Sequence, residues 1–268
     1  MKFLLALASL FLASCATAPQ PPAAIDPAQR LELSPRHHEW ITIESNGRQL
    51  HAYLAFSERS SLSPAVLVIH ENRGLDDWAR SVADQLAERG FIAIAPDMLS
   101  GAAPGGGRSS DFATDDARRE AIGKLQSASV LADLRAAADY VRNLPSTNDR
   151  FYTAGFCWGG ARVWQLANAY DGITASFVFY GTGPQEPEGV SGIDAPVYGL
   201  YGGADARVNA TIDRTAEVMR AAGKTFEPTI YDGAGHAFMR LGETTEASAA
   251  NRRARDEAWS RWLGLMMR

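Results

Sequence analysis

The chain has 268 residues, a length at which α/β folds routinely form one domain, and its 46% hydrophobic content excludes general disorder. Lys and Arg total 26 against 31 for Asp and Glu, and the resulting net charge of −5 excludes a generally basic surface for binding nucleic acid. The two cysteines, Cys15 and Cys157, allow at most one disulfide and exclude a four-thiolate metal site. Each cysteine therefore needs its own explanation.

The first residues have the pattern of an export signal. Met1-Lys2 precedes an apolar run that is too short to span a bilayer as a mature helix. The run ends in Leu12-Ala13-Ser14-Cys15, which resembles the bacterial lipobox, whose cysteine is lipidated and becomes the new N-terminus. Residues 1–14 are therefore interpreted as a lipoprotein signal peptide, with an ordinary signal and an incidental cysteine as the alternative. Because Ala16 is not a retention aspartate, the resemblance favours an outer-membrane anchor facing the periplasm.

The next segment, residues 15–37, is rich in Pro and Ala and is predicted to be an extended tether. The folded domain is predicted to cover residues 38–268. It opens with two runs of alternating apolar and polar residues on either side of Asn46-Gly47, which predicts a β-hairpin because both turn residues tolerate positive φ.

After the hairpin, short apolar runs alternate with amphipathic segments. This is the pattern of a mostly parallel sheet with helices on both faces. The predicted strands are residues 65–69, 91–95, 151–155, 175–179, 197–201 and 225–231, and the predicted helices are residues 77–89, 129–143, 160–169, 209–222 and 245–265. Residues 96–112, rich in Gly and Ser, are predicted to be a mobile loop. Ligands bind beyond the carboxyl ends of strands in such sheets, so the loops that follow strands are where chemistry is expected.

One such loop has the form of a nucleophile elbow. A predicted strand runs into a predicted helix through Gly155-Phe156-Cys157-Trp158-Gly159-Gly160. In an elbow, a strained turn presents the nucleophile, and the glycines let strand and helix cross closely. Cys157 would lie at a helix N-terminus, which favours the reactive thiolate. A buried structural cysteine is the alternative.

An acid and a histidine follow in the order that an elbow requires. Asp205 comes after the strand at residues 197–201, and His236 comes after the strand that ends at Tyr231. Taken singly, Asp205 reads as a helix cap and His236 as a loop residue. Three such residues, each beyond a strand end and in this order, predict a catalytic triad.

An early strand ends in His70-Glu71-Asn72-Arg73-Gly74, which places a carboxylate at the same edge of the sheet. With this glutamate, the elbow, Gly202-Gly203-Ala204-Asp205 and Gly235-His236-Ala237-Phe238, the chain from about Trp40 onward resembles the dienelactone hydrolase (carboxymethylenebutenolidase) family. The resemblance implies an α/β-hydrolase fold and an enzyme that cleaves a small ester or lactone. It implies Cys157 as nucleophile, His236 as base, Asp205 as its orienter, and Glu71 as the group that helps deprotonate the thiol when substrate binds. A helix cap or a surface salt bridge is the alternative for Glu71, and His70 is expected to be a packed histidine.

The resemblance also implies the substrate contacts. The oxyanion hole would use the backbone N–H groups of Trp158 and Asn72. The side chains of Trp158 and Phe238 are expected to line the acyl pocket, with a place in the core as the alternative for Trp158. Arg240 matches one of two arginines that hold a substrate carboxylate in the family, with a solvated arginine as the alternative, whereas Gly101 stands where the second would fall. Arg73 and Arg108 are the candidates to replace that second arginine.

No metal or organic cofactor is expected, because His37 and His38 lack a metal-ligand spacing and the chain has neither a Gly-x-Gly-x-x-Gly motif nor a phosphate loop. No Gly-x-Ser-x-Gly motif offers a competing serine nucleophile. The expected partners are a small ester or lactone substrate and the membrane through the lipid anchor alone, in a monomer that binds no nucleic acid. Two other functions stay open: a thioesterase or acyl transferase, and a non-catalytic ligand-binding lipoprotein on the same scaffold.

Overall fold

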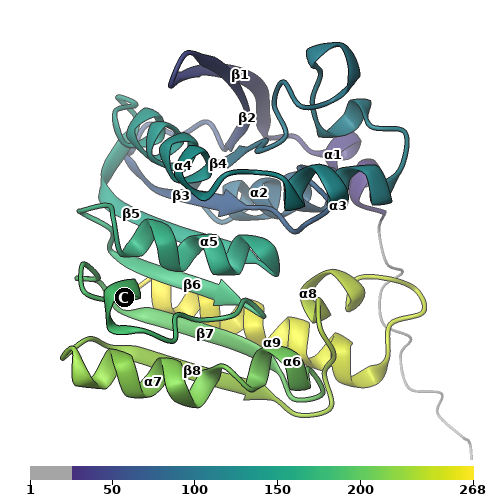
Figure 1. The fold of residues 1–268 in the computed structure, drawn as a ribbon. Coiled ribbons are helices and arrows are strands. Elements are labelled where there is room, and N and C mark those ends of the chain that lie inside the picture. The colour runs from purple at the N-terminus through teal and green to yellow at the C-terminus, as the bar shows by residue number, and fades with distance from the viewer. Residues whose placement is uncertain (1–25) are drawn as a thin grey trace, which may run out of the picture.

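The computed structural model describes residues 26–268 and is built around an eight-stranded sheet with the order β1-β2-β4-β3-β5-β6-β7-β8 (Figure 1). Strands β3 to β8 run parallel, while β1 and β2 form an antiparallel hairpin whose second strand pairs antiparallel with β4. The strands are β1 (His37–Ser45), β2 (Arg48–Phe56), β3 (Ser63–Ile69), β4 (Ile92–Pro96), β5 (Thr147–Phe156), β6 (Ala175–Phe179), β7 (Val197–Gly202) and β8 (Phe226–Tyr231).

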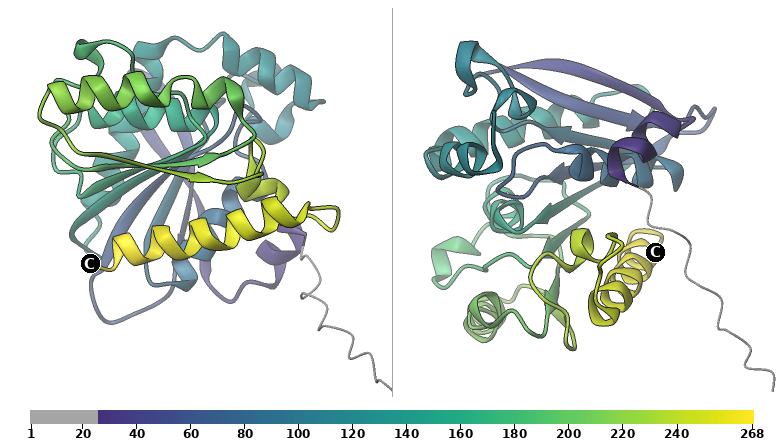
Figure 2. Two further views of the ribbon diagram at one scale, coloured as in Figure 1. Left: turned by 90° about the horizontal axis from the view of Figure 1, so that it is seen from below. Right: turned by 90° about the vertical axis from the view of Figure 1, so that its right-hand side faces the viewer.

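Helices cover both faces of this sheet (Figure 2). Helices α2 and α9 lie on one face, and α4, α5 and α7 lie on the other. The helices are α1 (Pro27–Leu33), α2 (Asp77–Glu88), α3 (Asp115–Gly123), α4 (Ser127–Arg142), α5 (Trp158–Ala167), α6 (Ala206–Asn209), α7 (Ile212–Ala221), α8 (Phe238–Leu241) and α9 (Ala249–Met266). Short 3-10 turns occur at Pro104–Gly106, Ser109–Asp111 and Pro187–Gly189. None of the helices between residues 26 and 268 has the length and apolar character needed to cross a membrane.

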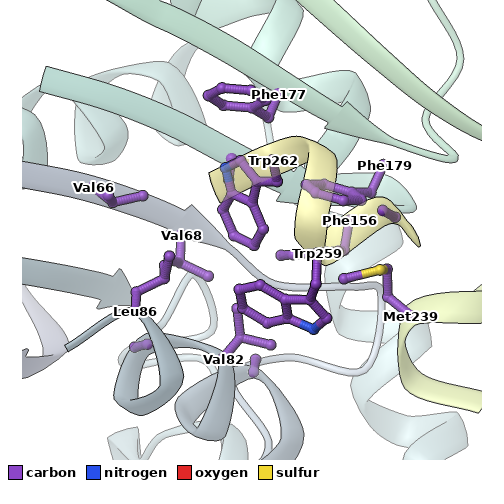
Figure 3. Packing of buried hydrophobic residues seen from close by; sticks show 14 of the residues in the cluster. Val66, Val68, Val82, Leu86, Phe156, Phe177, Phe179, Met239, Trp259 and Trp262 are labelled. Carbon is purple, nitrogen blue, oxygen red and sulfur yellow. The ribbon is translucent and has the colours of Figure 1, made fainter. Parts of the chain in front are cut away.

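The core has one layer on each face of the sheet, because side chains alternate along buried strands. Val66 and Val68 of β3 belong to the layer that contains Trp259 and Trp262 of α9 (Figure 3). Leu67, between the two valines, faces the other layer. Trp262 is fully buried, so α9 closes this face of the sheet.

The hairpin, the strands and the larger helices predicted from sequence are all present. Asn46 and Gly47 adopt φ values of 49° and 76°, as the predicted turn requires. Helix α3 was not predicted. Thr114 caps its first turn, but Ile122 is its only buried residue, so the segment lacks the apolar periodicity that marks a helix in a sequence.

The predicted tether overlaps the described residues only from Asp26 onward, and there the structure differs from an extended spacer. Asp26 caps α1, and α1 packs against α2. Just after α1, the side chains of Ser34, Arg36 and His38 all hydrogen-bond to the buried carboxylate of Asp84 in α2. This part of the segment therefore belongs to the folded domain. The predicted signal peptide and Cys15 lie outside the described residues.

The loop predicted to be mobile is anchored at both ends. Asp97 is fully buried and accepts hydrogen bonds from the backbone N–H of Leu99 and from both the N–H and the hydroxyl of Ser109. The hydroxyl of Ser109 in turn accepts a hydrogen bond from the N–H of Leu75 at 2.9 Å. These bonds fix the position of Arg108, which immediately precedes Ser109.

Candidate active site

Cys157 lies between β5 and α5, at the carboxyl edge of the sheet. Its backbone has φ 54° and ψ −113°, a conformation that is costly for a residue with a Cβ. The Cys157 N–H donates to the carbonyl oxygen of Phe179 at 3.0 Å, which ties the turn to the end of β6. The side chain is only partly buried. The structure thus has the strained strand-turn-helix geometry that the elbow motif predicts.

The glycines of the motif are required by close backbone contacts. A Cβ on Gly155 would lie 2.3 Å from the carbonyl oxygen of Gly159, and a Cβ on Gly159 would lie 2.3 Å from that of Ile69. Real side chains do not approach a backbone oxygen this closely. The spacing of glycines around Cys157 therefore reflects the crossing of α5 over β3 and β5.

His236 and Asp205 come together beyond the ends of β7 and β8. The imidazole Nδ1 of His236 donates to Oδ2 of Asp205 at 2.5 Å, and Oδ1 of Asp205 accepts from the N–H of Val208 at 3.3 Å. Asp205 is therefore both the predicted partner of the histidine and the cap of α6. With Nδ1 occupied, Nε2 is the nitrogen of His236 that remains for the thiol.

The environment of His236 favours the imidazolium form. Burial alone lowers its pKa, but hydrogen bonds with Cys157 and Asp205 outweigh burial and raise the pKa to about 9. The thiol of Cys157 is close enough to the imidazole to contribute to this rise in pKa. The order nucleophile, acid and base in the sequence thus corresponds to a spatial cluster.

Glu71 follows β3 and is 3% exposed. Arg240 Nε donates to its Oε2 at 2.8 Å, and the hydroxyl of Tyr180 donates to its Oε1 at 3.2 Å. Burial raises the pKa of Glu71, and the attraction of Arg240 only partly offsets this effect. The surface salt bridge considered for Glu71 is thus replaced by a buried pair in which the carboxylate can bind a proton more readily than usual.

Tyr180 is part of this cluster and was not predicted. It is fully buried, has φ 40°, and lies edge-on to the rings of His236 and Phe238 at centroid distances of 5.1 and 5.3 Å. Burial raises its pKa well above the usual value, so the hydroxyl stays protonated and acts as a donor. A tyrosine after an apolar strand carries no sequence signal for such a role; only its position at a strand end could have suggested it.

His70 is a packed histidine, as expected. Its Nδ1 donates to the carbonyl oxygen of Glu71 at 2.7 Å, and its Nε2 accepts from the N–H of Met98 at 3.2 Å. Burial lowers its pKa, which agrees with a neutral ring. The ring stacks on Trp158 with centroids 5.6 Å apart, so His70 joins the two turns that carry Glu71 and Cys157.

The backbone positions predicted for the oxyanion hole have spare donors. Within the described residues, neither the N–H of Trp158 nor that of Asn72 donates a hydrogen bond. Phe238, in contrast, is fully buried between Tyr180 and Tyr231. Its ring packs against these two tyrosines. The prediction that Phe238 faces a substrate pocket therefore differs from the structure.

Arg73, Arg108 and Arg240, the three arginines predicted to contact substrate, all line one cavity of about 650 Å³. Neither Cys157 nor His236 lines it. Arg240 connects the two places, because it forms part of the cavity wall while its Nε binds Glu71. Arg73 is itself paired with Asp76 and Asp115.

A mostly parallel sheet, a nucleophile elbow and a His–Asp pair beyond later strands define an enzyme of the α/β-hydrolase class. Between residues 26 and 268, no group of His, Cys, Asp and Glu side chains is arranged to hold a metal ion. Residues 50–268 match the Dienelactone hydrolase family, and the chain belongs to that family. It is a hydrolase of the dienelactone hydrolase type.

Known relatives agree with this assignment. A protein of Methylorubrum extorquens named as a carboxymethylenebutenolidase is 34% identical over 202 residues, covering 70% of this chain and 67% of the relative. A relative of the same name in Escherichia coli K12 is 31% identical over 211 residues, covering 74% of this chain and 76% of its own length. A crystal structure described as a dienelactone hydrolase from Klebsiella pneumoniae superimposes with a TM-score of 0.76 and 26% identity, over 87% of this chain and 99% of that one.

Proposed function

We propose that the chain hydrolyses small esters or lactones through Cys157 and a thioester acyl-enzyme. The observation that carries this proposal is the strained Cys157 turn with the hydrogen-bonded His236–Asp205 pair beside it. A strained turn that exposes a thiol at a helix N-terminus has no advantage for packing, but it presents a nucleophile to a carbonyl carbon.

In the acylation step, the thiolate of Cys157 adds to the carbonyl carbon of the ester. The N–H groups of Trp158 and Asn72 donate to the resulting oxyanion. When the C–O bond breaks, the departing alcohol oxygen takes the proton of the His236 imidazolium. Asp205 holds the imidazole in the orientation that this transfer needs.

In the deacylation step, His236 accepts a proton from water while the water oxygen attacks the thioester carbon. The C–S bond then breaks, which releases the carboxylic acid and restores the thiolate beside the protonated histidine. A thioester substrate would pass through the same two steps, with a thiol in place of the alcohol as leaving group.

Glu71 is assigned to deprotonation of the thiol. In the structure its carboxylate is held by Arg240 and Tyr180. A substrate that attracts Arg240 weakens this hold and leaves Glu71 as a base with a raised pKa, able to take the proton of Cys157. On this assignment, substrate binding is the event that frees Glu71 for the proton transfer.

The test is hydrolysis of 4-nitrophenyl acetate, a matched thioester and a small lactone by native protein and by Cys157→Ala. We expect native turnover to vanish in Cys157→Ala, and mass spectrometry of quenched native enzyme to show one acetyl group on the peptide that contains Cys157. His236→Ala should lower turnover by a factor of about 100 or more while the acetyl group persists longer. Equal turnover in native protein and Cys157→Ala would disprove the proposed nucleophile.

We further propose that the protein is exported and anchored by lipid at Cys15. The support is the Leu12-Ala13-Ser14-Cys15 pattern after a short apolar run. Expressed in a Gram-negative host, the full chain should partition with outer membranes, and Cys15→Ser should leave it unprocessed or soluble. Recovery of the native chain from the cytoplasm with Met1 attached would contradict the proposal.

A further inference from the structure

His70 is fully buried and contacts both turns that carry the proposed oxyanion donors. One turn contains the backbone N–H of Asn72 and the other contains that of Trp158, and neither N–H donates a hydrogen bond within residues 26–268. The turns also touch through their backbones, because a Cβ on Gly159 would lie 2.5 Å from the carbonyl oxygen of His70. A side chain in this position can affect both donors at once.

The hydrogen bonds of His70 determine which of its ring nitrogens carries the proton. Nδ1 lies 2.7 Å from the carbonyl oxygen of Glu71, which can only accept, and Nε2 lies 3.2 Å from the backbone N–H of Met98, which can only donate. Both bonds form only when the ring is neutral and its proton is on Nδ1. Burial lowers the pKa of His70, which agrees with a neutral ring.

The bond from Nδ1 orients the peptide group that joins Glu71 to Asn72. In a trans peptide the C=O and N–H groups point in opposite directions, and no peptide bond in the described part of the chain is cis. Since the carbonyl oxygen of Glu71 is held towards the imidazole, the N–H of Asn72 is directed away from it. The N–H of Gly74 also donates to this carbonyl, at the longer distance of 3.3 Å. A carbonyl that accepts hydrogen bonds polarises its peptide group, which makes the N–H a stronger donor.

The ring of His70 also supports the second donor. It stacks on the ring of Trp158, with centroids 5.6 Å apart and planes inclined by 14°. Met98, which holds Nε2, follows Asp97, and the buried Asp97 accepts hydrogen bonds from the N–H and the hydroxyl of Ser109. The loop after β4 thus fixes the imidazole that contacts both turns.

We propose that His70 is a positioning residue for the oxyanion hole: its Nδ1–H sets the direction of the Asn72 N–H, and its ring sets the place of Trp158. The inference rests on the proposed hydrolytic function, in which both N–H groups donate to the oxyanion. It assigns to His70 no contact with substrate and no proton transfer. The side chain of Glu71 is held by other partners, so loss of the His70 donor leaves deprotonation of the thiol in place.

The test compares two reactions of Cys157, of which one forms an oxyanion and the other does not. Acylation by 4-nitrophenyl acetate passes through an oxyanion, and its rate constant is measured as single-turnover release of nitrophenolate. Methyl methanethiosulfonate transfers a methylthio group to the same thiolate, with methanesulfinate as the leaving group, and it has no carbonyl group. The ratio of the two rate constants therefore reports on the oxyanion hole rather than on the reactivity of the thiol.

Two substitutions of similar shape separate the hydrogen bond of Nδ1 from the rest of the ring. His70→Asn places an amide N–H at the position of Nδ1, whereas His70→Leu places a methyl group there, and both lose the stacked ring and the acceptor for Met98. We expect acylation to be about ten- to a hundred-fold slower in His70→Leu than in His70→Asn, because a displaced donor stabilises the oxyanion less. The thiosulfonate reaction should differ between them by less than about twofold, since it forms no oxyanion.

The outcomes separate a positioning role from a structural one. Equal acylation of the two variants would overturn the proposal, and so would a parallel loss of both reactions in His70→Leu. His37→Leu, at an exposed histidine of β1, is the control for loss of an imidazole and should keep both native rate constants. If His70→Leu does not fold, His70→Met is the second variant without a donor, and it is compared with His70→Asn in the same way.

Nitrogen NMR of the native protein tests the hydrogen bond itself. At neutral pH we expect one imidazole with a protonated Nδ1 and an unprotonated Nε2, whose signals are absent from the spectrum of His70→Asn. A His70 ring protonated on Nε2 would overturn the proposal. If the thiosulfonate modifies native Cys157 but nitrophenyl acetate does not acylate it, the proposed hydrolytic function is wrong and the role of His70 falls with it. Native acylation rates in His70→Leu would refute the role of His70 alone.

Discussion

His236 shows how strongly neighbouring groups determine the protonation state of a partly buried side chain. Its ring is partly buried, which disfavours charge, yet its bonds with Cys157 and Asp205 raise the pKa to about 9. At neutral pH the histidine is therefore protonated, which is the state that the proposed mechanism needs for transfer to the leaving alcohol. This ties the pH dependence of the enzyme to Cys157 as well as to the histidine.

The first prediction concerns this titration. In native protein, the His236 ring should lose its proton as pH rises through about 9, and in Cys157→Ala the midpoint should fall, because the thiol is one of the groups that raise the pKa. Since the pKa is raised from 6.5, the associated stabilisation is complete below pH 6.5 and is lost as pH rises through about 9. Proton NMR of the imidazole signals measures both midpoints. His70 is an internal reference, because burial lowers its pKa. An unchanged midpoint for His236 in Cys157→Ala would show that Cys157 does not raise the pKa of the histidine.

The second prediction concerns the buried pair of Glu71 and Arg240. Arg240→Ala leaves a buried carboxylate without its cation, and the pKa of Glu71 rises further. A carboxyl group whose pKa is raised in the folded state stabilises the fold at low pH, and this stabilisation is lost as pH rises through the folded-state pKa. The free energy of unfolding of the variant should therefore be reduced more at pH 8 than at pH 5. The difference should be on the order of 1–3 kcal/mol, because Arg240 keeps some solvent contact.

Urea denaturation at the two pH values measures this effect. The matched control is Glu71→Gln combined with Arg240→Ala, which removes the charge and should abolish the extra loss at pH 8. If the single and double variants show the same pH dependence, Glu71 is not the group responsible.

At the scale of elements, the segment that follows α1 is attached to α2 through Asp84. Burial alone raises the pKa of this carboxyl, but hydrogen bonds from Arg36, Ser34 and His38 outweigh burial and lower it. The segment after α1 is therefore held by a charged centre, and α1 itself, which has no fully buried residue, contacts the core through the partly buried Leu31.

The third prediction follows from this attachment. Asp84→Asn should lower the free energy of unfolding at pH 7 by about 1–3 kcal/mol and speed amide exchange in α1. Because the native pKa is lowered, the stabilisation exists above pH 3.8 and is lost as pH falls through the lower native value, so the variant and native protein should converge in acid. Glu88→Gln, an exposed carboxylate at the edge of the same network, is the control and should change stability little. Equal losses in the two variants would show that Asp84 has no special role.

The fourth prediction concerns the crossing of α5 over the sheet. Gly159→Ala places a Cβ against the backbone oxygen of Ile69, and backbone cannot yield as a flexible side chain can. We expect a loss of about 3 kcal/mol or more, together with loss of esterase activity. Gly264→Ala on the exposed side of α9 has open space around it and should raise stability by about 0.5–1 kcal/mol. Chemical denaturation of both variants measures the two changes in stability. The prediction is wrong if Gly159→Ala is as stable as native protein.

Across the whole molecule, some features of the site are determined by a short stretch of sequence, and others depend on contacts between residues far apart in the chain. The elbow could be predicted because six consecutive residues carry its strain and its close contacts. The Arg240–Glu71 pair joins residues 169 positions apart, and Tyr180 acts through a hydroxyl that meets Glu71 only after β6 pairs beside β5. No local pattern encodes either contact.

The same distinction explains the errors at the edges of the fold. The loop before α3 was predicted to be mobile from its glycines, but one buried carboxylate, Asp97, organises it. Residues 27–33 were assigned to the tether as part of a segment rich in Pro and Ala, and the helix exists there through its cap and its neighbour α2. Composition thus predicts which segments form the apolar core. It does not predict which further segments are attached to that core by polar contacts.

The position of α1 has one more consequence. Asp26, Pro27 and Ala28 form part of the wall of the cavity beyond Arg240. If Cys15 carries a lipid, the eleven residue steps from Cys15 to Asp26 reach at most about 40 Å, so the entrance to the cavity is kept near the bilayer. An ester that collects at a membrane surface would then meet the enzyme by diffusing in two dimensions rather than three. The anchor would in this way favour substrates that are concentrated at the membrane, independently of the side chains that bind them.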